Sequence, residues 1–480
     1  MKKLKIINIL ILLLLLTGSC KKYVEGYDKD PNGLLDTNDE QLMQGVILEN
    51  QFFNHSDGLR IGMMWMNQAT GTDRQYVSFN NWNSVANQQF DSPWGEVYTV
   101  IGQARLLEQK TTDLNNIKLR GLAKLFRAWA GGMAASLWGD VPFSEAGLPD
   151  QFPDPKYDAQ ADVFNQVQTL LDEAIADLNN PVGIIYAKKD IYYGNLVNGS
   201  NDSQQIAAWV RLAHALKARF YLNAKDYQHA YDEATNSGFT ASDDIIAPYE
   251  VYPGNYSKYN PMFQFDVFNR EGYIGEVDAY ASDLLQARDN NVETGRLYFN
   301  YIPDAAILNT YPGYWWLGFD GKFSGPQSLM TYGELQLIRA EARARLDGNI
   351  SAALTIYNDY RNMLQSYTPQ IGTSGWGQSY PPYAPSDFQS GGSQYNGVDE
   401  LTSFLREVLE ERYVYFIGDL EAFVDHARTH GENGVEGYMQ LKPGFNGQPL
   451  RFIYPQAEID SNDNFPGEAP KVTVPLPMYQ

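Results

Sequence analysis

The sequence predicts a mainly α-helical fold, in which tetratricopeptide-like helical hairpins form a scaffold that carries long, loop-rich insertions. In residues 331–364, apolar side chains recur at helical spacing on both sides of a short break at residues 347–349. Two helices joined by so short a turn must lie antiparallel. Similar helical patterns fill residues 38–235 and 331–430. Because such hairpins bury their apolar faces only against neighbours, we expect them to stack.

The individual helices are expected where apolar residues repeat every three or four positions between capping and breaking residues. Thr331 and Glu334 have the spacing of a capping box, and Gly348 is placed to close the helix that they open. Residues 55–90 fit neither a clean helix nor a clean strand. The expected helices cover residues 38–53, 92–110, 117–138, 158–178, 202–222, 224–237, both halves of 331–364, and 401–416.

The helix expected at residues 117–138 carries its positive charges near its N-terminus, where they oppose the helix dipole. We therefore expect these side chains to reach acidic neighbours or solvent. They are Lys118, Arg120, Lys124 and Arg127.

Two stretches interrupt the helical pattern, residues 238–330 and 367–398. Both are rich in Asn, Gly, Pro and aromatic residues, and loops this long in a compact protein are usually functional or disordered. Their aromatic content argues against disorder. We interpret them as packed, ligand-facing insertions, and we expect the Pro-rich tail from residue 434 onward to wrap around the scaffold.

The N-terminus predicts export and lipidation. Three lysines precede an apolar run at residues 6–16, which is too short to span a bilayer but fits a secretory signal. Cys20 is the only cysteine of the chain, and it follows small residues as in a bacterial lipobox, with Thr17 where that motif usually has Leu. We expect residues 1–19 to be a lipoprotein signal peptide, Cys20 to be lipidated, and residues 20–480 to form the mature domain. The alternatives are an ordinary signal peptide or a buried N-terminal helix.

The composition excludes some function classes. With a formal net charge of −22, the chain has no excess of positive charge to neutralise phosphates, so we expect no nucleic-acid partner. A single cysteine allows no intramolecular disulfide. Aromatic residues make up 14% of the chain. This fraction is high for a helical protein, so we expect some of these residues to have a role beyond packing the core.

Several motifs together resemble the SusD/RagB family of outer-membrane nutrient-binding lipoproteins. They are the lipobox-like start, the DPNG stretch at residues 30–33, and residues 120–143, 212–222, 338–346, 410–423 and 454–464. The likeness spans nearly the whole chain. One departure is GDLEAFVDHAR at residues 418–428, where many members carry an arginine-rich stretch, so the local salt-bridge pattern is expected to differ.

The resemblance implies a SusD-like fold of four tetratricopeptide-like repeats with a loop-rich ligand-binding face. It also implies a lipid anchor in the outer membrane facing the cell exterior. The implied partner is a SusC-like TonB-dependent transporter, over which the lipoprotein acts as a lid. Family members usually capture oligosaccharides, some bind peptides, and most are not enzymes, so no catalytic residue and no cofactor is expected.

Sugar capture requires an aromatic ring against the C–H face of a pyranose, with amides and carboxylates around its hydroxyls. Ligand residues of the family tend to come from the region after the first helix and from the central insertion. The candidates there are Trp65, Tyr76, Trp82, Tyr314, Trp315 and Trp316. For any one of them the competing interpretation is burial in the core. Four tryptophans on helical stripes are assigned to the core: Trp94, Trp129, Trp138 and Trp209.

Enzyme and metal interpretations find little support. The sequence has no G-x-S-x-G, P-loop or H-E-x-x-H motif. His426 and His430 have metal-ligand spacing on a helix, but an exposed helix end is favoured because no further ligand stands out. Asp28 to Asp39 partly matches a calcium-binding loop, with Pro31 inside it and Asp in place of the last Glu. No metal site is therefore expected.

The leading hypothesis is a non-catalytic, cell-surface, oligosaccharide-binding lipoprotein that delivers its ligand to the transporter. A peptide-capturing, RagB-like member is the second. A secreted helical glycoside hydrolase or lyase and a pure protein-docking scaffold are the alternatives from other classes.

Overall fold

The computed structural model describes residues 37–250, 254–288, 291–303, 315–317, 325–365, 380–440, 442, 447–467 and 469–480. It is mainly α-helical, as predicted. The longer helices are α2 (Asp39–His55), α3 (Asp57–Trp65), α5 (Asp91–Asp113), α6 (Ile117–Trp138), α7 (Gln160–Leu178), α8 (Ser203–Asn223), α9 (Tyr227–Asn236), α14 (Tyr332–Asp347), α15 (Ser351–Met363), α16 (Glu400–Tyr415) and α17 (Glu421–Thr429).

Short elements fill the connections. The short helices are α4 (Arg74–Phe79), α10 (Pro261–Phe263), α11 (Tyr280–Ala287), α12 (Asn291–Asn300) and α18 (Gln456–Ser461), with a π-helical turn at Gln264–Asn269. The strands form antiparallel pairs: β1 (Thr70–Gly71) with β5 (Ile274–Gly275), β2 (Val141–Pro142) with β3 (Tyr157–Asp158), β4 (Ile245–Ala247) with β8 (Gln327–Met330), and β6 (Tyr301–Pro303) with β7 (Trp315–Leu317).

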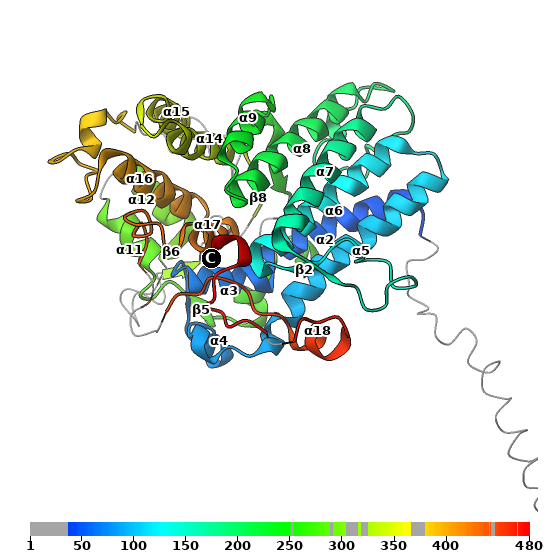
Figure 1. Ribbon diagram of the computed structural model, residues 1–480, viewed down its shortest axis with the longest axis horizontal. Coiled ribbons are helices and arrows are strands. Elements are labelled where there is room, and N and C mark those ends of the chain that lie inside the picture. The colour runs from blue at the N-terminus through cyan, green and yellow to red at the C-terminus, as the bar shows by residue number, and fades with distance from the viewer. Residues whose placement is uncertain are drawn as a thin grey trace, which may run out of the picture.

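The long helices pack side by side in chain order, from α5 through α6, α7, α8 and α9 to α14 and α15 (Figure 1). Tight turns join α5 to α6, α8 to α9 and α14 to α15, so the predicted hairpins are confirmed. The Thr331 hydroxyl accepts a hydrogen bond from the Glu334 amide at 3.3 Å, and Gly348 ends α14 at φ +63°. Gly348 suits this left-handed conformation because it has no Cβ.

Helix α6 lies at the centre of the stack and is almost wholly buried. Gly131 and Gly132 allow the rings of Phe143 and Phe220 to lie directly against its backbone, where a Cβ would overlap them. The small residues of this helix therefore permit close helix approach.

The positive charges of α6 reach acidic neighbours, as predicted. Lys118 contacts Asp202 at 2.6 Å, Arg120 contacts Asp177 at 2.7 Å, and Arg127 contacts Glu108 at 2.8 Å. Lys124 also reaches Asp177, at 3.0 Å. These pairs tie α6 to α5, α7 and the start of α8, and they offset the unfavourable position of the cations on the helix dipole.

Two regions are more regular than expected. Residues 55–90 contain α3 and α4, and the insertion at residues 238–330 contains α11 and α12. These helices are six to ten residues long, which is too short for their apolar spacing to stand out in the sequence.

The C-terminal tail wraps the scaffold, as predicted, and ends near the middle of the view in Figure 1. The Trp138 indole donates to the Ile453 carbonyl at 3.0 Å, and the Tyr479 hydroxyl donates to the Asn223 carbonyl at 2.6 Å. No helix within the described ranges combines the length and the apolarity needed to cross a membrane.

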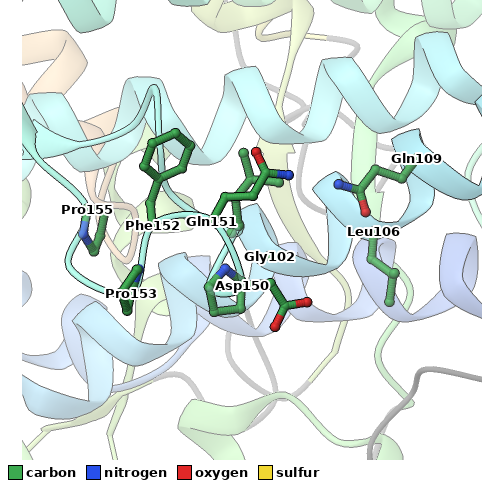
Figure 2. A pocket seen from close by; sticks show the side chains of 11 residues that line it. Gly102, Leu106, Gln109, Asp150, Gln151, Phe152, Pro153 and Pro155 are labelled. Carbon is green, nitrogen blue, oxygen red and sulfur yellow. The ribbon is translucent and has the colours of Figure 1, made fainter.

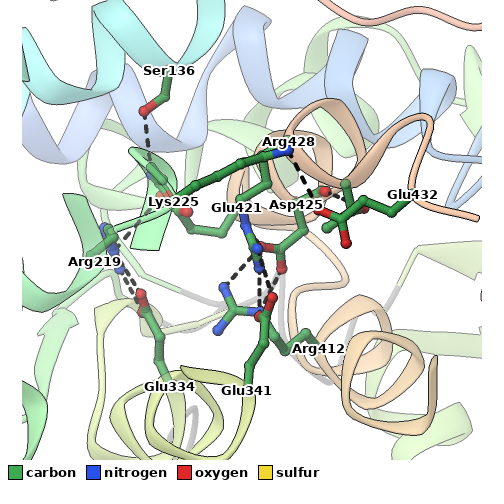
Figure 3. Close-up of polar contacts among 12 residues, drawn as sticks. Ser136, Arg219, Lys225, Glu334, Glu341, Arg412, Glu421, Asp425, Arg428 and Glu432 are labelled. Carbon is green, nitrogen blue, oxygen red and sulfur yellow. Dashed lines mark hydrogen bonds and ion pairs between the residues drawn. The ribbon is translucent and has the colours of Figure 1, made fainter. Parts of the chain in front are cut away.

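A buried ion network joins α14, α16 and α17 (Figure 3). Arg428 binds both oxygens of Glu341 at 2.6 Å, and it also contacts Asp425 at 2.8 Å. Arg412 donates to Asp425 at 2.6 Å. Glu341, Arg412 and Arg428 are each 0% exposed. Burial alone would raise the pKa of Glu341, but Arg428 and Arg345 outweigh burial and hold that pKa well below its usual range.

Arg219 of α8 extends this network on one side, because it binds both oxygens of Glu334 at 2.6 Å. Glu421 lies 3.7 Å from Arg219, and its oxygens accept no hydrogen bond from the described residues. The stretch at residues 418–428, where the chain departs from the arginine-rich pattern, thus supplies three buried members of the network, Glu421, Asp425 and Arg428.

We predict that Glu341→Gln lowers the free energy of unfolding by about 3–5 kcal/mol, because it leaves Arg428 buried without its main counter-charge. Chemical denaturation measures this change. Asp347→Asn on the same helix removes an equal charge from a partly exposed pair with Arg343 and is expected to cost less than about 1 kcal/mol. Equal losses in the two variants would contradict the role of burial.

Glu421 gives a prediction for the pH dependence of stability. Burial and the neighbouring Glu334, acting against Arg219, raise the pKa of Glu421 from 4.5 to about 8. Its proton therefore stabilises the folded state below pH 4.5, and that contribution is lost as the pH rises through 8. Glu421→Gln cannot ionise, so its stability relative to wild type should rise by at least about 1 kcal/mol between pH 6 and pH 9.

Thermal unfolding of both proteins at the two pH values checks this expectation. Glu334→Gln is the control, because it breaks the bidentate pair with Arg219 and should destabilise at both pH values. A constant difference between Glu421→Gln and wild type would show that Glu421 is ionised throughout.

Candidate ligand-binding site

The two regions expected to supply ligand residues meet in the structure. Strands β1 and β5 pair antiparallel, with Thr70 opposite Gly275 and Gly71 opposite Ile274. The Thr72 amide then donates to the Tyr273 carbonyl at 2.8 Å. Helix α4 and strand β5 accordingly lie together at the lower edge of the molecule in Figure 1.

Aromatic packing holds this junction together. The Tyr76 ring of α4 lies 4.9 Å from Phe265 of the π-helical turn and 6.1 Å from Tyr273. The Phe265 ring also has the Arg60 guanidinium of α3 4.4 Å from its centre. Residues 264–273 are therefore seated on α3 and α4 by ring contacts worth about 0.5–1.5 kcal/mol each beyond their buried area.

An exposed aromatic patch, defined here as Tyr256 and Phe268 above the buried rings of Tyr259 and Phe263, lies on the central insertion. Tyr256 is 45% exposed and Phe268 is 46% exposed, with ring centres 5.4 Å apart. Phe268 lies nearly parallel to Tyr259 at 5.9 Å. The buried rings thus support two rings that are each nearly half exposed.

Amide side chains surround the aromatic patch. The Tyr256 hydroxyl donates to the Asn269 side chain at 3.1 Å, and the Gln264 amide donates to the carbonyls of Tyr256 and Tyr259 at 2.8 and 3.0 Å. Asn255 is also exposed beside them. Apolar ring faces bordered by amides are the groups that a pyranose needs for its C–H face and its hydroxyls.

A buried carboxyl group lies in the same turn. Asp266 is 3% exposed, and its oxygens accept no hydrogen bond within the described ranges. Burial and the nearby Glu271 raise the pKa of Asp266 well above its usual range, although Arg60 acts in the opposite direction. Burial of Asp266 therefore favours its neutral form.

Three predicted ligand residues do not have an accessible ring. Trp65 is 0% exposed among Phe90, Phe423 and Phe452, and its indole donates to the Phe79 carbonyl at 3.0 Å. The expectation that it stacks on a ligand is wrong for this structure, because distant segments enclose it.

Tyr76 and Trp82 need the same correction, since they are 6% and 1% exposed. Tyr76 lies directly beneath the candidate site, where its ring supports Phe265 and Tyr273. It therefore acts as a support for the site, and its ring has little surface left for a ligand.

The remaining three predicted residues stay predictions. Tyr314 lies outside the described residues. Trp315 and Trp316 belong to β7, where their backbones pair with Pro303 and Ile302. Strand β7 lies beside β5, so the predicted tryptophans enter the structure next to the junction that bears the aromatic patch.

Sequence reasoning missed Phe268. It lies three residues after Phe265 in the π-helical turn, but the exposure of the two rings differs: Phe265 is 9% exposed and Phe268 is 46% exposed. The available signal was the density of aromatic residues in the insertion, which does not tell an exposed ring from a buried one.

A second surface, here named the α5 groove, lies between α5 and residues 147–155 (Figure 2). Its volume is about 540 Å³, and Gln109, Asp150, Gln151 and the 37%-exposed Phe152 contribute to its lining. Arg105 holds the loop in place by donating to the Ser144 and Ala146 carbonyls at 2.7 and 3.1 Å. The groove offers one partly exposed ring, whereas the aromatic patch offers two.

The histidine pair lies in surroundings that differ from the expected exposed helix end. His426 is 6% exposed, not at an exposed helix end as expected, and burial together with His430 lowers its pKa to about 3. His430 instead contacts Glu436 at 3.3 Å. The described residues contain no group of three or more His, Cys, Asp or Glu side chains arranged for a metal ion. Most of the calcium-loop match, including Asp28, lies outside the described residues.

Comparisons with solved structures support the fold. A SusD/RagB family protein from Bacteroides thetaiotaomicron is 20% identical, with a TM-score of 0.65 over 89% of this chain and 95% of that one. A SusD homologue from Bacteroides fragilis is 18% identical, with a TM-score of 0.61 over 89% and 94%. A chitin-binding protein is 16% identical, with a TM-score of 0.59 over 89% and 94%.

A search of curated proteins found no match. A family model described as "starch-binding associating with outer membrane" matches residues 31–455, which is most of the sequence. The chain therefore belongs to the SusD-like family of starch-binding proteins that associate with the outer membrane.

Proposed function

We propose that this protein captures oligosaccharides at the cell surface and delivers them, without catalysis, to a SusC-like TonB-dependent transporter. The observation that carries the proposal is the aromatic patch, where Tyr256 and Phe268 expose nearly half of their surfaces beside amide side chains. Family membership and the chitin-binding protein among the structural neighbours agree with a glycan ligand.

The proposed ligand lies across Tyr256 and Phe268, with its hydroxyls toward Asn255 and Asn269. A free pyranose is neutral and polar at its rim, so binding must replace water at the rim with amide hydrogen bonds while the C–H face covers a ring. Trp315 and Trp316 are proposed to extend this surface, because β7 lies beside β5.

The proposed site requires presentation at the outside of the cell. We propose that residues 1–19 are removed, that Cys20 carries the lipid, and that the anchor sits in the outer membrane with the protein facing outward. A diacyl or triacyl cysteine supplies enough buried CH₂ groups for stable anchoring, which one chain alone does not.

We predict that Phe268→Ala weakens oligosaccharide binding about tenfold, because loss of ring stacking of roughly 1.4 kcal/mol corresponds to that change in Kd. Isothermal titration of the mature protein against an oligosaccharide panel measures the effect. Phe152→Ala in the α5 groove is the matched control, since Phe152 is also a partly exposed phenylalanine.

The design separates binding from folding. Trp65→Ala removes a fully buried ring and is expected to lower stability by about 3–5 kcal/mol. Phe268→Ala should leave the thermal midpoint nearly unchanged. Loss of binding in Phe152→Ala with no effect of Phe268→Ala would move the site to the α5 groove. Release of shortened glycans during the titration would favour an enzyme.

We predict that Cys20→Ser abolishes membrane attachment without changing the affinity for the glycan. Membrane fractionation with metabolic labelling by a fatty acid measures attachment, and titration of the soluble variant measures affinity. Co-purification of a large TonB-dependent barrel with the wild-type protein from solubilised membranes is the expected sign of the transporter partner. Continued fatty-acid labelling of Cys20→Ser would contradict the assignment of the anchor.

A further inference from the structure

Two arginines converge on one ring beside the aromatic patch. The Arg74 guanidinium lies 5.5 Å from the centre of the Tyr273 ring, and the Arg270 guanidinium lies 5.8 Å from it. Both side chains are exposed. They come from segments almost two hundred residues apart, which the β1–β5 pair brings together.

The arginines are continuous with the aromatic patch. Arg270 directly follows Asn269, which accepts a hydrogen bond from the Tyr256 hydroxyl. Arg270 also donates to the Asn269 carbonyl at 2.9 Å, and this bond holds its head group near the patch. A ligand that covers Tyr256 and Phe268 would therefore have the positive charge of Arg270 close to one of its ends.

The backbone at Arg74 is unusual. Its φ is +46°, in the left-handed region that costs a non-glycine residue roughly 1–2 kcal/mol. The Asp73 side chain accepts from the Arg74 amide at 2.8 Å and so helps to hold this conformation at the start of α4. Strain of this kind persists where the direction of a side chain matters, and here the side chain is directed over Tyr273.

The head groups retain unused hydrogen-bond donors. A guanidinium over an aromatic ring keeps its in-plane N–H groups available for a carboxylate. Arg74 has only a 3.7 Å contact with Asp73, with both side chains more than half exposed, and such a pair contributes little. Within the described ranges, Arg270 has no ion pair, although the chain has 58 acidic residues against 36 basic ones. Elsewhere, buried arginines such as Arg296 and Arg428 are paired with carboxylates.

We propose that the site selects anionic oligosaccharides, whose carboxylates or sulfate esters bind Arg74 and Arg270 while a neighbouring sugar ring lies on the aromatic patch. This inference rests on the proposed glycan-binding function and specifies its ligand class. Uronic acid units are the chemistry favoured most, because planar carboxylates match the fork of a guanidinium.

The test is isothermal titration of the mature protein with three pairs of oligosaccharides. Oligogalacturonate is paired with its methyl ester, alginate oligosaccharides with their carboxyl-reduced form, and chondroitin sulfate oligosaccharides with their desulfated form. At least one acidic member should bind, and its neutralised partner should bind at least about tenfold more weakly. The pairs distinguish a carboxylate from a sulfate as the recognised anion.

Arginine variants connect the selectivity to this site. Arg74→Gln and Arg270→Gln should each weaken binding of the acidic ligand about five- to tenfold and should reduce its dependence on salt between 50 and 300 mM. Lys156→Gln is the control, since it removes the same charge from an exposed side chain on another segment and should have no effect. Unchanged thermal midpoints exclude misfolding.

Three other outcomes would contradict the inference, and each has a different meaning. Equal affinity for charged and neutralised oligosaccharides, or no effect of either arginine variant, overturns the inference and leaves glycan binding intact. Absence of binding to every oligosaccharide, with neutral starch and chitin fragments included, overturns the proposed function as well. Binding of oligopeptides that is lost on amidation of their C-terminus would assign the arginines to a peptide carboxylate and overturn the glycan inference.

Discussion

The pairing of buried charges among α14, α16 and α17 constrains the rest of the structure. Glu341, Arg412 and Arg428 have no exposed surface, and removing a charge from water costs several kcal/mol unless an opposite charge meets it with good geometry. Arg428 meets this condition only where it reaches Glu341 and Asp425 together. The network therefore allows few relative positions of the three helices.

A chain of direct contacts leads from this network to the candidate site. Phe423, on the same helix as Arg428, packs 5.7 Å from Trp65 at the end of α3. The Gln68 amide donates to the Tyr413 and Phe416 carbonyls at 3.3 and 3.2 Å, just before β1 begins. These contacts place β1 and, through its pairing, β5 and Tyr273. The geometry of the candidate site is therefore set by residues outside it.

Lys442 adds a second attachment at the same junction. Its ammonium donates to the Ala69 carbonyl, the Thr70 hydroxyl and the Asn80 side chain at 2.9, 3.0 and 2.8 Å. Burial lowers the pKa of Lys442 to about 7, although Asp278 acts in the opposite direction. The many aromatic residues have two roles. Buried rings such as Trp65 and Tyr76 pack the segments beneath the candidate site, whereas Tyr256 and Phe268 remain partly exposed in the aromatic patch.

The sequence by itself determined most of the longer helices and their hairpins, because helix periodicity, capping and short turns are local properties of the chain. Motifs along the chain indicated the family. Trp129, Trp138 and Trp209 were assigned to the core from their helical stripes, and each is 0% exposed. The family resemblance predicted two regions for ligand residues, which β1 and β5 bring together, but Trp65 in the first of them is buried. Only the tertiary structure decided which rings are exposed, because Trp65 is covered by Phe423 and Phe452, more than 350 residues away in the sequence. It likewise brought Arg74 and Arg270 to one ring, since strand pairing between distant segments leaves no signal in local sequence.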